Sequence, residues 1–333
     1  MKVFILGSGA TAGTLPSCPT TPGFGTALQG RLAPKRLEGK YPELAKVVAD
    51  LWPEQKAGGS AWDLAHAWTL IDYFSKFPSL RCGGDYGPQA SFELHAALLE
   101  VYGRKLCDDL EALLQTGNGF TLLDIVAEVR PGDVVVSFNW DVSVEIMAAK
   151  MGVQLVQAPH LVTMGVSFIK LHGSVSWPRT IVPPWIVNTR ATPAPCREPM
   201  EPDDVIKNCV EHPCNDCRQP FVIGAVPIKT ELIGQFQGGH AGSPYTVLME
   251  QWKCFMDALA AADEVVIAGY NFPDDDGYGR FLVKEAIARR GRLLRRLYFY
   301  ELDKAQVGMS AKLDQIFKPG TTPIFRGPVT RYA

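Results

Sequence analysis

Four short apolar runs of this sequence are each followed at once by residues that could bind or transform a ligand. These residues are Gly7-Ser8-Gly9-Ala10-Thr11 after Val3–Leu6, Asn139 and Asp141 after Val134–Phe138, His172 after Phe168–Leu171, and Gly269-Tyr270-Asn271 after Glu264–Ala268. Runs of this length and composition predict strands buried in a parallel sheet. Ligands of such sheets bind beyond the carboxyl ends of the strands. We therefore expect the four segments to meet at one edge of the sheet.

The glycine-containing loop Gly7–Thr11 is suited to a pyrophosphate. Glycine lets the backbone approach a ligand closely, and the start of a following helix offers free N–H groups and a positive dipole end. The same spacing fits an ordinary dinucleotide-binding fingerprint, but that pattern requires an acidic strand end about 20 residues later. Residues 25–40 instead offer Arg31, Lys35, Arg36 and Lys40 in a predicted loop. A glycine-rich turn that binds no nucleotide is the remaining alternative.

Asn139 and His172 are the residues best suited to act on a hydroxyl group or a water molecule. An amide carries both a donor and an acceptor, and a histidine can take up a proton near neutral pH. Each site residue also has a purely structural interpretation. Asp141 could serve only as the N-cap of a helix predicted at Val142–Lys150. A lone histidine at a strand end is commonly a hydrogen-bonded core residue, and the same interpretation applies to His66 and His95 in predicted helices.

The order of predicted elements indicates an α/β fold. Of the 333 residues, 47% are hydrophobic, which is enough for a large core. After the strand at Phe168–Leu171, the pattern predicts a helix from Pro244 to Ala262, a strand at Glu264–Ala268, a helix at Tyr278–Arg290, a strand at Leu297–Glu301 and a helix at Lys304–Phe317. Repeated alternation of this kind predicts a Rossmann-like, doubly wound parallel sheet within a single domain over residues 1–333.

Residues 41–115 predict a helical insertion into this domain. Apolar residues recur at spacings of three and four in Tyr41–Leu51, Ala61–Phe77 and Phe92–Leu114. The preceding stretch Pro16–Pro34 is rich in Pro, Gly and Thr and lacks such a period, which predicts an irregular loop.

Residues 178–220 predict a small cysteine-bearing module between the strand at Phe168–Leu171 and a returning strand at Phe221–Ile228. Its cysteines are Cys196, Cys209, Cys214 and Cys217. The Cys-x-x-Cys pair places two thiolates on one tight turn, and two more from upstream would complete the tetrahedron of a structural zinc site. The alternative is a loop with incidental reduced cysteines.

Charge and hydropathy narrow the class of partner. A formal net charge of −2 and a pI near 6.3 provide no overall field for a nucleic-acid backbone. No apolar stretch approaches the roughly 20 residues of a membrane span, and the apolar run at Val3–Leu6 is too short for a signal peptide. We therefore expect a cytoplasmic protein with no direct membrane or nucleic-acid binding.

Four motifs resemble those of sirtuin-like NAD-binding domains, in the same order along the chain. Phe4–Thr11 resembles their opening Gly-Ala-Gly-Ala-Ser loop, Ser137–Asp141 their Thr-Asn-Tyr-Asp strand end, and Leu171–Ser174 their catalytic Leu-His-Gly-Ser. The run Val265–Asp276 resembles a Gly-Tyr-Ser-Phe/Leu-Pro-x-x-Asp signature of the bacterial branch. The resemblance spans residues 4–276 and excludes only the helical insertion and the cysteine segment.

This resemblance implies that NAD is the ligand and substrate. It implies that Gly7–Thr11 hold phosphate, that Asn139, Asp141 and His172 form the catalytic group on the ribose, and that Gly269–Asn271 line the adenosine side. Glu301, at the end of its strand, would accept hydrogen bonds from the adenosine ribose. Sirtuins carry a zinc module at the position of the cysteine segment, although with two paired Cys-x-x-Cys motifs.

One departure decides between reactions. Protein-deacylating sirtuins follow the glycine loop with Gly-Ile-Pro-Asp-Phe-Arg, whereas this chain has Leu15-Pro16-Ser17-Cys18-Pro19. Water is then the expected acceptor, and the expected activity is NAD glycohydrolysis. An NAD-dependent protein deacylase and a non-catalytic sensor of NAD or ADP-ribose are the alternatives. The bacterial branch includes NAD-depleting effectors of antiphage defence, and an enzyme of that kind needs restraint, so we expect a homo-oligomer or a regulatory partner that contacts the helical insertion.

Overall fold

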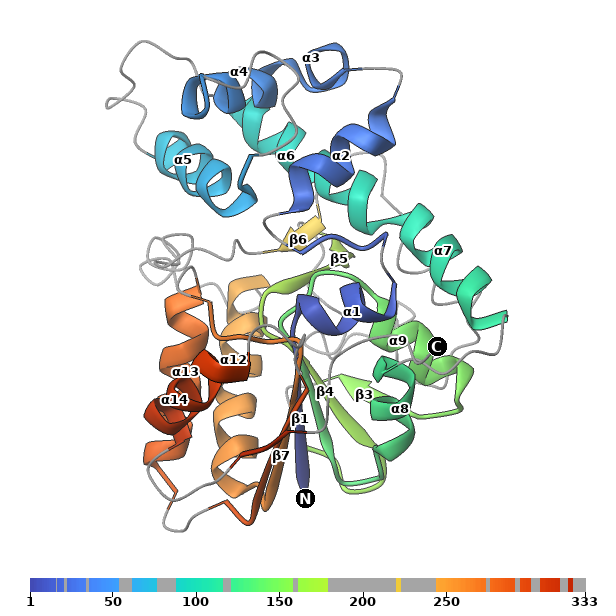
Figure 1. Ribbon diagram of the computed structural model, residues 1–333, viewed down its shortest axis with the longest axis vertical. Coiled ribbons are helices and arrows are strands. Elements are labelled where there is room, and N and C mark those ends of the chain that lie inside the picture. The colour runs from blue at the N-terminus through green and yellow to red at the C-terminus, as the bar shows by residue number, and fades with distance from the viewer. Residues whose placement is uncertain are drawn as a thin grey trace.

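Among the residues that the structure describes, seven short strands pair into one sheet in which every neighbouring pair is parallel. The strands are β1 (Lys2–Leu6), β2 (Val134–Ser137), β3 (Leu155–Gln157), β4 (Val166–Lys170), β7 (Glu264–Ala268), β8 (Arg296–Tyr300) and β9 (Pro323–Phe325), in the spatial order β3-β4-β2-β1-β7-β8-β9 (Figure 1). The chain first adds β2, β3 and β4 on one side of β1 and then adds β7, β8 and β9 on the other side. This reversal between β1 and β7 creates the crevice in which doubly wound sheets bind ligands.

The protein is described from a computed structural model. The described residues are 1–15, 17–20, 23–33, 36–53, 62–76, 88–115, 121–157, 161–178, 220–222, 244–273, 276–290, 294–300, 306–317 and 323–325.

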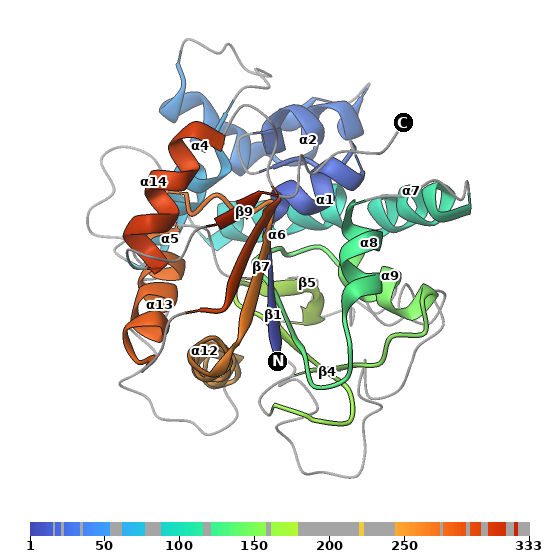
Figure 2. The same ribbon diagram turned by 60° about the horizontal axis from the view of Figure 1, so that its bottom comes forward.

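Helices cover both faces of the sheet. Successive side chains of a strand point to opposite faces, and apolar side chains are buried on both of them. Val3 and Ile5 pack in one apolar cluster, whereas Phe4 and Leu6 pack in another. The helices on the first face are α12 (Pro244–Ala261), α13 (Gly277–Ala288) and α14 (Gln306–Phe317). Those on the second face are α1 (Ser8–Thr14), α8 (Thr121–Glu128) and α9 (Ser143–Lys150) (Figure 2). The predicted Rossmann-like α/β fold is confirmed.

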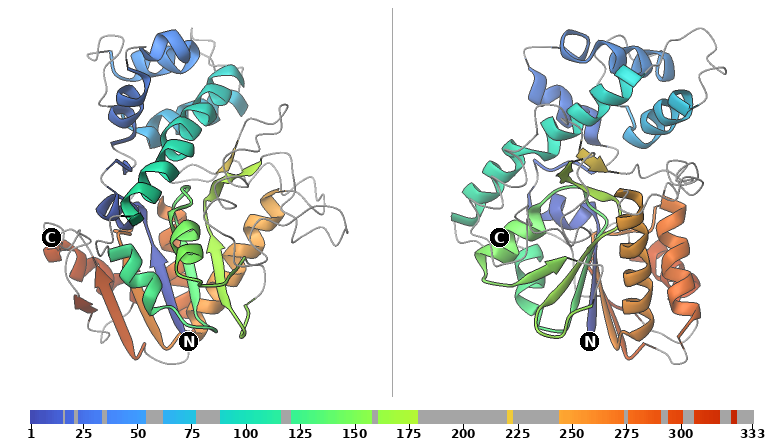
Figure 3. Two further views of the ribbon diagram at one scale, coloured as in Figure 1. Left: turned by 90° about the vertical axis from the view of Figure 1, so that its right-hand side faces the viewer. Right: turned by 180° about the vertical axis from the view of Figure 1, so that it is seen from behind.

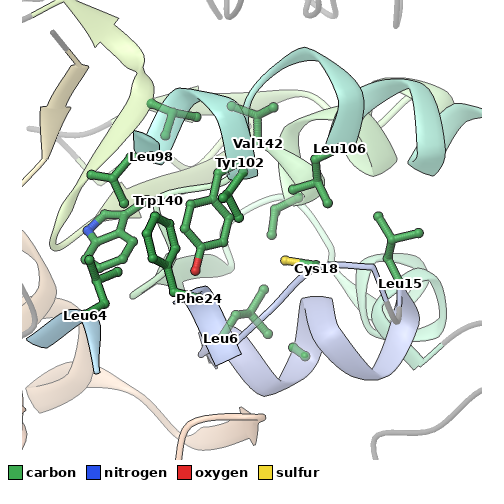
Figure 4. Packing of buried hydrophobic residues seen from close by; sticks show 14 of the residues in the cluster. Leu6, Leu15, Cys18, Phe24, Leu64, Leu98, Tyr102, Leu106, Trp140 and Val142 are labelled. Atoms are coloured by element: carbon green, nitrogen blue, oxygen red, sulfur yellow. The ribbon is translucent and has the colours of Figure 1, made fainter. Parts of the chain in front are cut away.

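A layer of further helices lies over the carboxyl end of the sheet (Figures 1 and 3). It consists of α2 (Phe24–Leu32), α3 (Leu37–Lys40), α4 (Pro42–Leu51), α5 (Leu64–Lys76), α6 (Pro88–Tyr102) and α7 (Arg104–Gln115). The helix α6 runs through the middle of this layer and contacts α2, α4, α5 and α7. Residues of the layer share one apolar cluster with the sheet, including Phe24 of α2, Leu98 of α6 and Leu6 of β1 (Figure 4). The layer is therefore built onto the core of the domain.

Two predicted segments differ in the structure. The prediction of an irregular loop over Pro16–Pro34 is wrong, because α2 forms within it. Phe24, Leu28 and Leu32 recur every four residues and are buried, a helical period hidden by the surrounding Pro, Gly and Thr. The single helix predicted at Phe92–Leu114 is two helices, α6 and α7, that meet at Gly103. A side chain on Gly103 would overlap the carbonyl oxygen of Leu99.

The predicted returning strand Phe221–Ile228 begins within β6 (Pro220–Val222). It pairs antiparallel with β5 (Gly173–Pro178) in a separate two-stranded sheet, not with the main sheet. Residues 179–219, which hold the four crowded cysteines, lie outside the described residues. Within the described part of the chain, no helix is both long and apolar enough to cross a membrane.

The turns that follow β1 and β7 touch each other through glycine. The amide of Gly7 donates to Ala268 O at 2.9 Å, and the amide of Gly9 donates to Gly269 O at 3.0 Å. Gly269 has a φ of +61°, and a side chain on it would overlap the backbone of Gly9 and Ala10. The contact requires an absent side chain and a left-handed backbone at one position, which only glycine supplies without strain.

Replacement of Gly269 by alanine should therefore lower the free energy of unfolding by about 3 kcal/mol or more, because it adds a left-handed backbone penalty to an overlap with α1. Gly30→Ala is the matched control. Gly30 lies within α2, and a methyl group on it would meet no other atom within 4 Å, so this change should stabilise the helix by about 0.5–1 kcal/mol. Urea unfolding of both variants measures the difference, and an unchanged midpoint for Gly269→Ala would contradict the contact.

Candidate functional site

The register of the sheet brings the four predicted segments together. Leu6 pairs with both Ser137 and Ala268, and Ser137 pairs with Lys170, so these residues form one row at the carboxyl edge. Two residues beyond that row, the chain reaches Asn139 after β2 and His172 after β4. Because β2 and β4 are neighbours, both residues lie at the same edge of the sheet, and both line one cavity.

A cavity opens at this edge. About 570 Å³ of space lies between its lining atoms, a volume that includes open solvent. Its lining comes from every one of the four segments, from the helical layer and from the loop after α1: Ser8, Pro19, Tyr102, Phe138, Asn139, Trp140, Asp141, His172, Gly269, Tyr270, Asn271, Pro273 and Asp276.

The side chain of Asn139 donates two hydrogen bonds, and its buried oxygen accepts none from the described residues. Its Nδ2 donates to Gly7 O and to Thr11 Oγ1, both at 3.0 Å. A backbone carbonyl only accepts, so this geometry fixes which end of the amide is nitrogen. The Oδ1 atom is buried and accepts no hydrogen bond from the described residues. Such an atom carries a desolvation cost that a ligand donor would remove.

His172 is held at both ring nitrogens. Its Nδ1 lies 3.0 Å from Phe138 O, and its Nε2 lies 3.2 Å from Oδ2 of Asp276. The ring also meets the edge of Phe138, with centroids 5.4 Å apart. The side chain is thus oriented by groups from two other segments, although it lies on the cavity.

Asp276 contacts His172 and also binds the hydroxyl of Tyr270. The hydroxyl of Tyr270 donates to Asp276 Oδ2 at 2.8 Å, and its ring stacks on Phe138 at 3.9 Å. Burial and the charge of Asp276 raise the pKa of Tyr270 well above its usual value, so it remains a hydrogen-bond donor. Phe272, two residues after Tyr270, has a φ of +51°, which is a strained backbone conformation for a residue other than glycine. Its ring packs against Phe317, which helps to hold this conformation.

Asp141 ties the β2 loop to two helices. Its Oδ1 accepts from the amide of Ser143 at 2.9 Å and from Thr11 Oγ1 at 3.4 Å. The residue at the N-cap position of α9 is Val142, one residue later than predicted for Asp141. Asp141 lines the cavity but is buried, and these bonds give it a structural role beside any chemical one.

The buried ion pair between Lys170 and Glu145 holds the loop that follows β2. Lys170 Nζ donates to Asp141 O at 2.6 Å, to Glu145 Oε1 at 2.8 Å and to Ser174 Oγ at 2.9 Å. The lysine side chain is fully buried. Burial raises the pKa of Glu145, and the nearby lysine charge opposes that rise. The pair therefore fixes the backbone at Asp141 through a charged group that is absent from the cavity lining.

The backbone amides of the glycine loop make hydrogen bonds within the protein. The amides of Gly7 and Gly9 donate to the β7 turn, and the amide of Ala10 donates to Gly7 O. Thr11 is buried and bonded to Asn139 and Asp141. Ser8 is the residue of this loop that lines the cavity, so a phosphate would meet the loop at Ser8.

Aromatic residues close the cavity on the side of the helical layer. Tyr102, at the end of α6, packs edge-on to Trp140 at 5.9 Å and stacks on Phe24 at 5.9 Å (Figure 4). Its hydroxyl donates to Pro19 O at 3.3 Å. Burial, together with the nearby Cys18 and Asp141, raises the pKa of Tyr102. The helical layer is thus part of the site.

Some predicted site residues are not placed here. Glu301 and the proposed zinc ligands Cys196, Cys209, Cys214 and Cys217 lie outside the described residues. In the described part of the chain, no three metal-binding side chains cluster together. Sequence reasoning did not assign roles to Asp276, Lys170 or Tyr102. Asp276 lay within the run Val265–Asp276, and a lysine in an otherwise apolar predicted strand was the available signal for Lys170.

Lys170→Met should destabilise the protein by about 3–5 kcal/mol, because it leaves Glu145 buried without its partner. The double variant Lys170→Met/Glu145→Leu should recover part of that loss, since no unpaired charge remains. The surface pair Lys46–Glu43 offers a control: Lys46 is 65% exposed, and Lys46→Met should cost less than about 1 kcal/mol. Denaturant unfolding tests all three, and equal effects for Lys170→Met and Lys46→Met would count against the buried pair.

Comparison of the chain with known protein families and with curated proteins finds no matching family model and no matching protein. The residues of the cavity and the motifs that resemble those of sirtuin-like domains are therefore the basis for a functional proposal.

Proposed function

We propose that this protein is an NAD glycohydrolase, which cleaves the bond between nicotinamide and ribose and releases nicotinamide and ADP-ribose. The observation that carries the proposal is that Asn139 and His172 follow neighbouring strands and line one cavity, with Asn139 Oδ1 buried and unsatisfied among the described residues. This is the pair that the sirtuin-like motifs assign to the ribose.

The chemistry of NAD cleavage suits these groups. Nicotinamide leaves as a neutral base from a cationic ring, so the reaction needs no strong acid on the leaving group. It needs stabilisation of a cationic ribose and an oriented nucleophile. Asn139 Oδ1 can accept from a ribose hydroxyl or the attacking water, and His172 supplies an acid–base group on the same cavity. Ser8 would meet phosphate, and Gly269, Tyr270 and Asn271 would line the adenosine side.

The proposal extends to regulation. An unrestrained NAD hydrolase would poison its own cell, so a homo-oligomer or a protein partner is proposed to control it. The helical insertion, residues 41–115, is the proposed contact surface, because its helix α6 brings Tyr102 to the cavity. A role as an NAD-depleting effector of defence, in the cytoplasm, belongs to the same proposal and rests on the resemblance to the bacterial sirtuin-like branch.

Purified protein incubated with NAD should release nicotinamide, and Asn139→Ala and His172→Ala should each lower that rate on the order of a hundredfold or more. Because both residues act on one ribose, the double variant should be little slower than the slower single variant. His66→Ala is the control, since His66 is 72% exposed and lies away from the cavity lining. Its rate should match the wild type.

The outcomes separate the alternatives. Turnover only in the presence of an acylated peptide would make the protein a deacylase, and tight binding of NAD without turnover would make it a sensor module. Wild-type nicotinamide release by both single variants would show that the assigned active site is wrong. Because Asn139 also bonds Gly7 and Thr11, thermal unfolding of each variant must accompany its kinetics.

We also propose one structural zinc ion held by Cys196, Cys209, Cys214 and Cys217. Protein purified without chelators should then contain about one zinc per chain by elemental analysis, a content that follows from four-coordinate thiolate sites. Cys214→Ser should lose the metal, whereas Cys254→Ser should keep it. Cys254 is the matched control because it is a buried free cysteine on α12, where burial and Asp257 raise its pKa to about 11. Zinc-free wild-type protein would count heavily against the site.

A further inference from the structure

The backbone that leads into His172 leaves the sheet where one neighbouring strand has already ended. β3 ends at Gln157, opposite Phe168, so the last residues of β4 have only β2 beside them among the described strands. Gly173 then turns the chain away from the sheet with a φ of +77°. Buried backbone groups at such a strand end need hydrogen-bond partners from elsewhere, because an unpaired group costs free energy.

Two side chains of α12 supply these partners. Gln251 Oε1 accepts from the amide of Lys170 at 2.6 Å, and Trp252 Nε1 donates to Leu171 O at 2.8 Å. Both side chains are buried. The Nε2 atom of Gln251 makes no hydrogen bond with the described residues, so this side chain serves the strand through its oxygen. One helix thus fixes the backbone of the two residues before His172.

Trp252 also packs on the second segment that holds His172. Its ring lies against Tyr278 in the first turn of α13, with ring centroids 4.4 Å apart. Asp276 caps that helix by accepting from the amide of Gly279, and an oxygen of Asp276 lies 3.2 Å from His172 Nε2. Trp252 therefore touches both segments whose relative position sets where the imidazole ring lies.

We propose that Trp252 and Gln251 are positioning residues, which hold His172 at the cavity without touching the ligand. Neither is among the described residues that line the cavity. An acid–base group must stay within about 0.5 Å of its productive geometry, and a displacement of about 1 Å can lower a rate a hundredfold. Loss of either hydrogen bond frees a backbone group beside His172 and lets the ring move. This role rests on the proposed cleavage of NAD.

Gln251→Leu and Trp252→Phe each remove one of these hydrogen bonds. Each should lower kcat for nicotinamide release about tenfold or more, per folded molecule by circular dichroism, while KM for NAD changes less than about twofold. Gln251→Glu keeps an acceptor for Lys170 and should recover most of the rate, because burial favours the neutral acid. Trp62→Phe is the matched control. Trp62 is as buried as Trp252 and packs on Phe24, and kcat of this variant should match the wild type.

The ring of His172 gives a second readout that needs no enzymatic activity. Its ¹H–¹³C signals are assigned by their loss in His172→Gln. They should shift in Gln251→Leu and stay in place in Gln251→Glu and Trp62→Phe. Because Gln251→Leu neither adds nor removes an aromatic ring, a shift in that variant reports a displaced imidazole.

A wild-type kcat in both Gln251→Leu and Trp252→Phe overturns the proposal, as does an equal loss of kcat in Trp62→Phe. A raised KM with an unchanged kcat also overturns it, because α12 would then support ligand binding and not His172. If Trp252→Phe does not fold, Gln251→Leu decides. If the wild type does not cleave NAD, the proposed function fails, and the His172 signals still decide whether α12 positions the ring.

Discussion

The contact between the turns that follow β1 and β7 is the constraint on which this site depends. Gly7, Gly9 and Gly269 allow two backbones to touch where any side chain would keep them apart. The distance between those turns sets where Asn139 finds its partner Gly7 O and where Tyr270 lies against Phe138. Glycine in this loop therefore has a structural task in the described molecule, which precedes any contact with phosphate.

Buried polar groups then fix the loops in place. Asn139, Thr11 and Asp141 form one chain of hydrogen bonds, and Lys170 holds the Asp141 carbonyl from the opposite side. A buried polar network that is fully paired rigidifies its surroundings, because each unpaired member would cost free energy. Two buried acceptors of this network have no hydrogen-bond donor among the described residues, Asn139 Oδ1 and Glu145 Oε2, and of these two residues Asn139 is the one that lines the cavity. An unsatisfied acceptor at a cavity is the feature expected where a ligand completes the bonding.

The long strands of the main sheet could be predicted from the sequence because buried parallel strands are continuous apolar runs. The residues that follow these strands lie at one edge of the sheet because the strands run in the same direction and share one register. Sequence reasoning missed β3 and β9, which are three residues long and carry too little pattern. It missed α2 because proline and glycine dominate its surroundings. Among site residues, Asn139 and His172 lie two residues beyond the predicted strands β2 and β4, and Asp276 ends a motif of the resemblance, whereas Tyr102 reaches the cavity through tertiary packing that no local pattern encodes.

Tyr102 connects the helical layer to the cavity. Tyr102 ends α6, the helix that packs against α2, α4, α5 and α7, and its ring lies against Trp140 on the cavity. Because the core is continuous, α6 cannot shift without repacking this aromatic wall, and close-packed interiors transmit such shifts instead of absorbing them. A contact that moved α6 would thus bear on the cavity through packing. The apolar cluster of Leu6, Phe24, Leu98 and Tyr102 is the physical path along which that coupling would run.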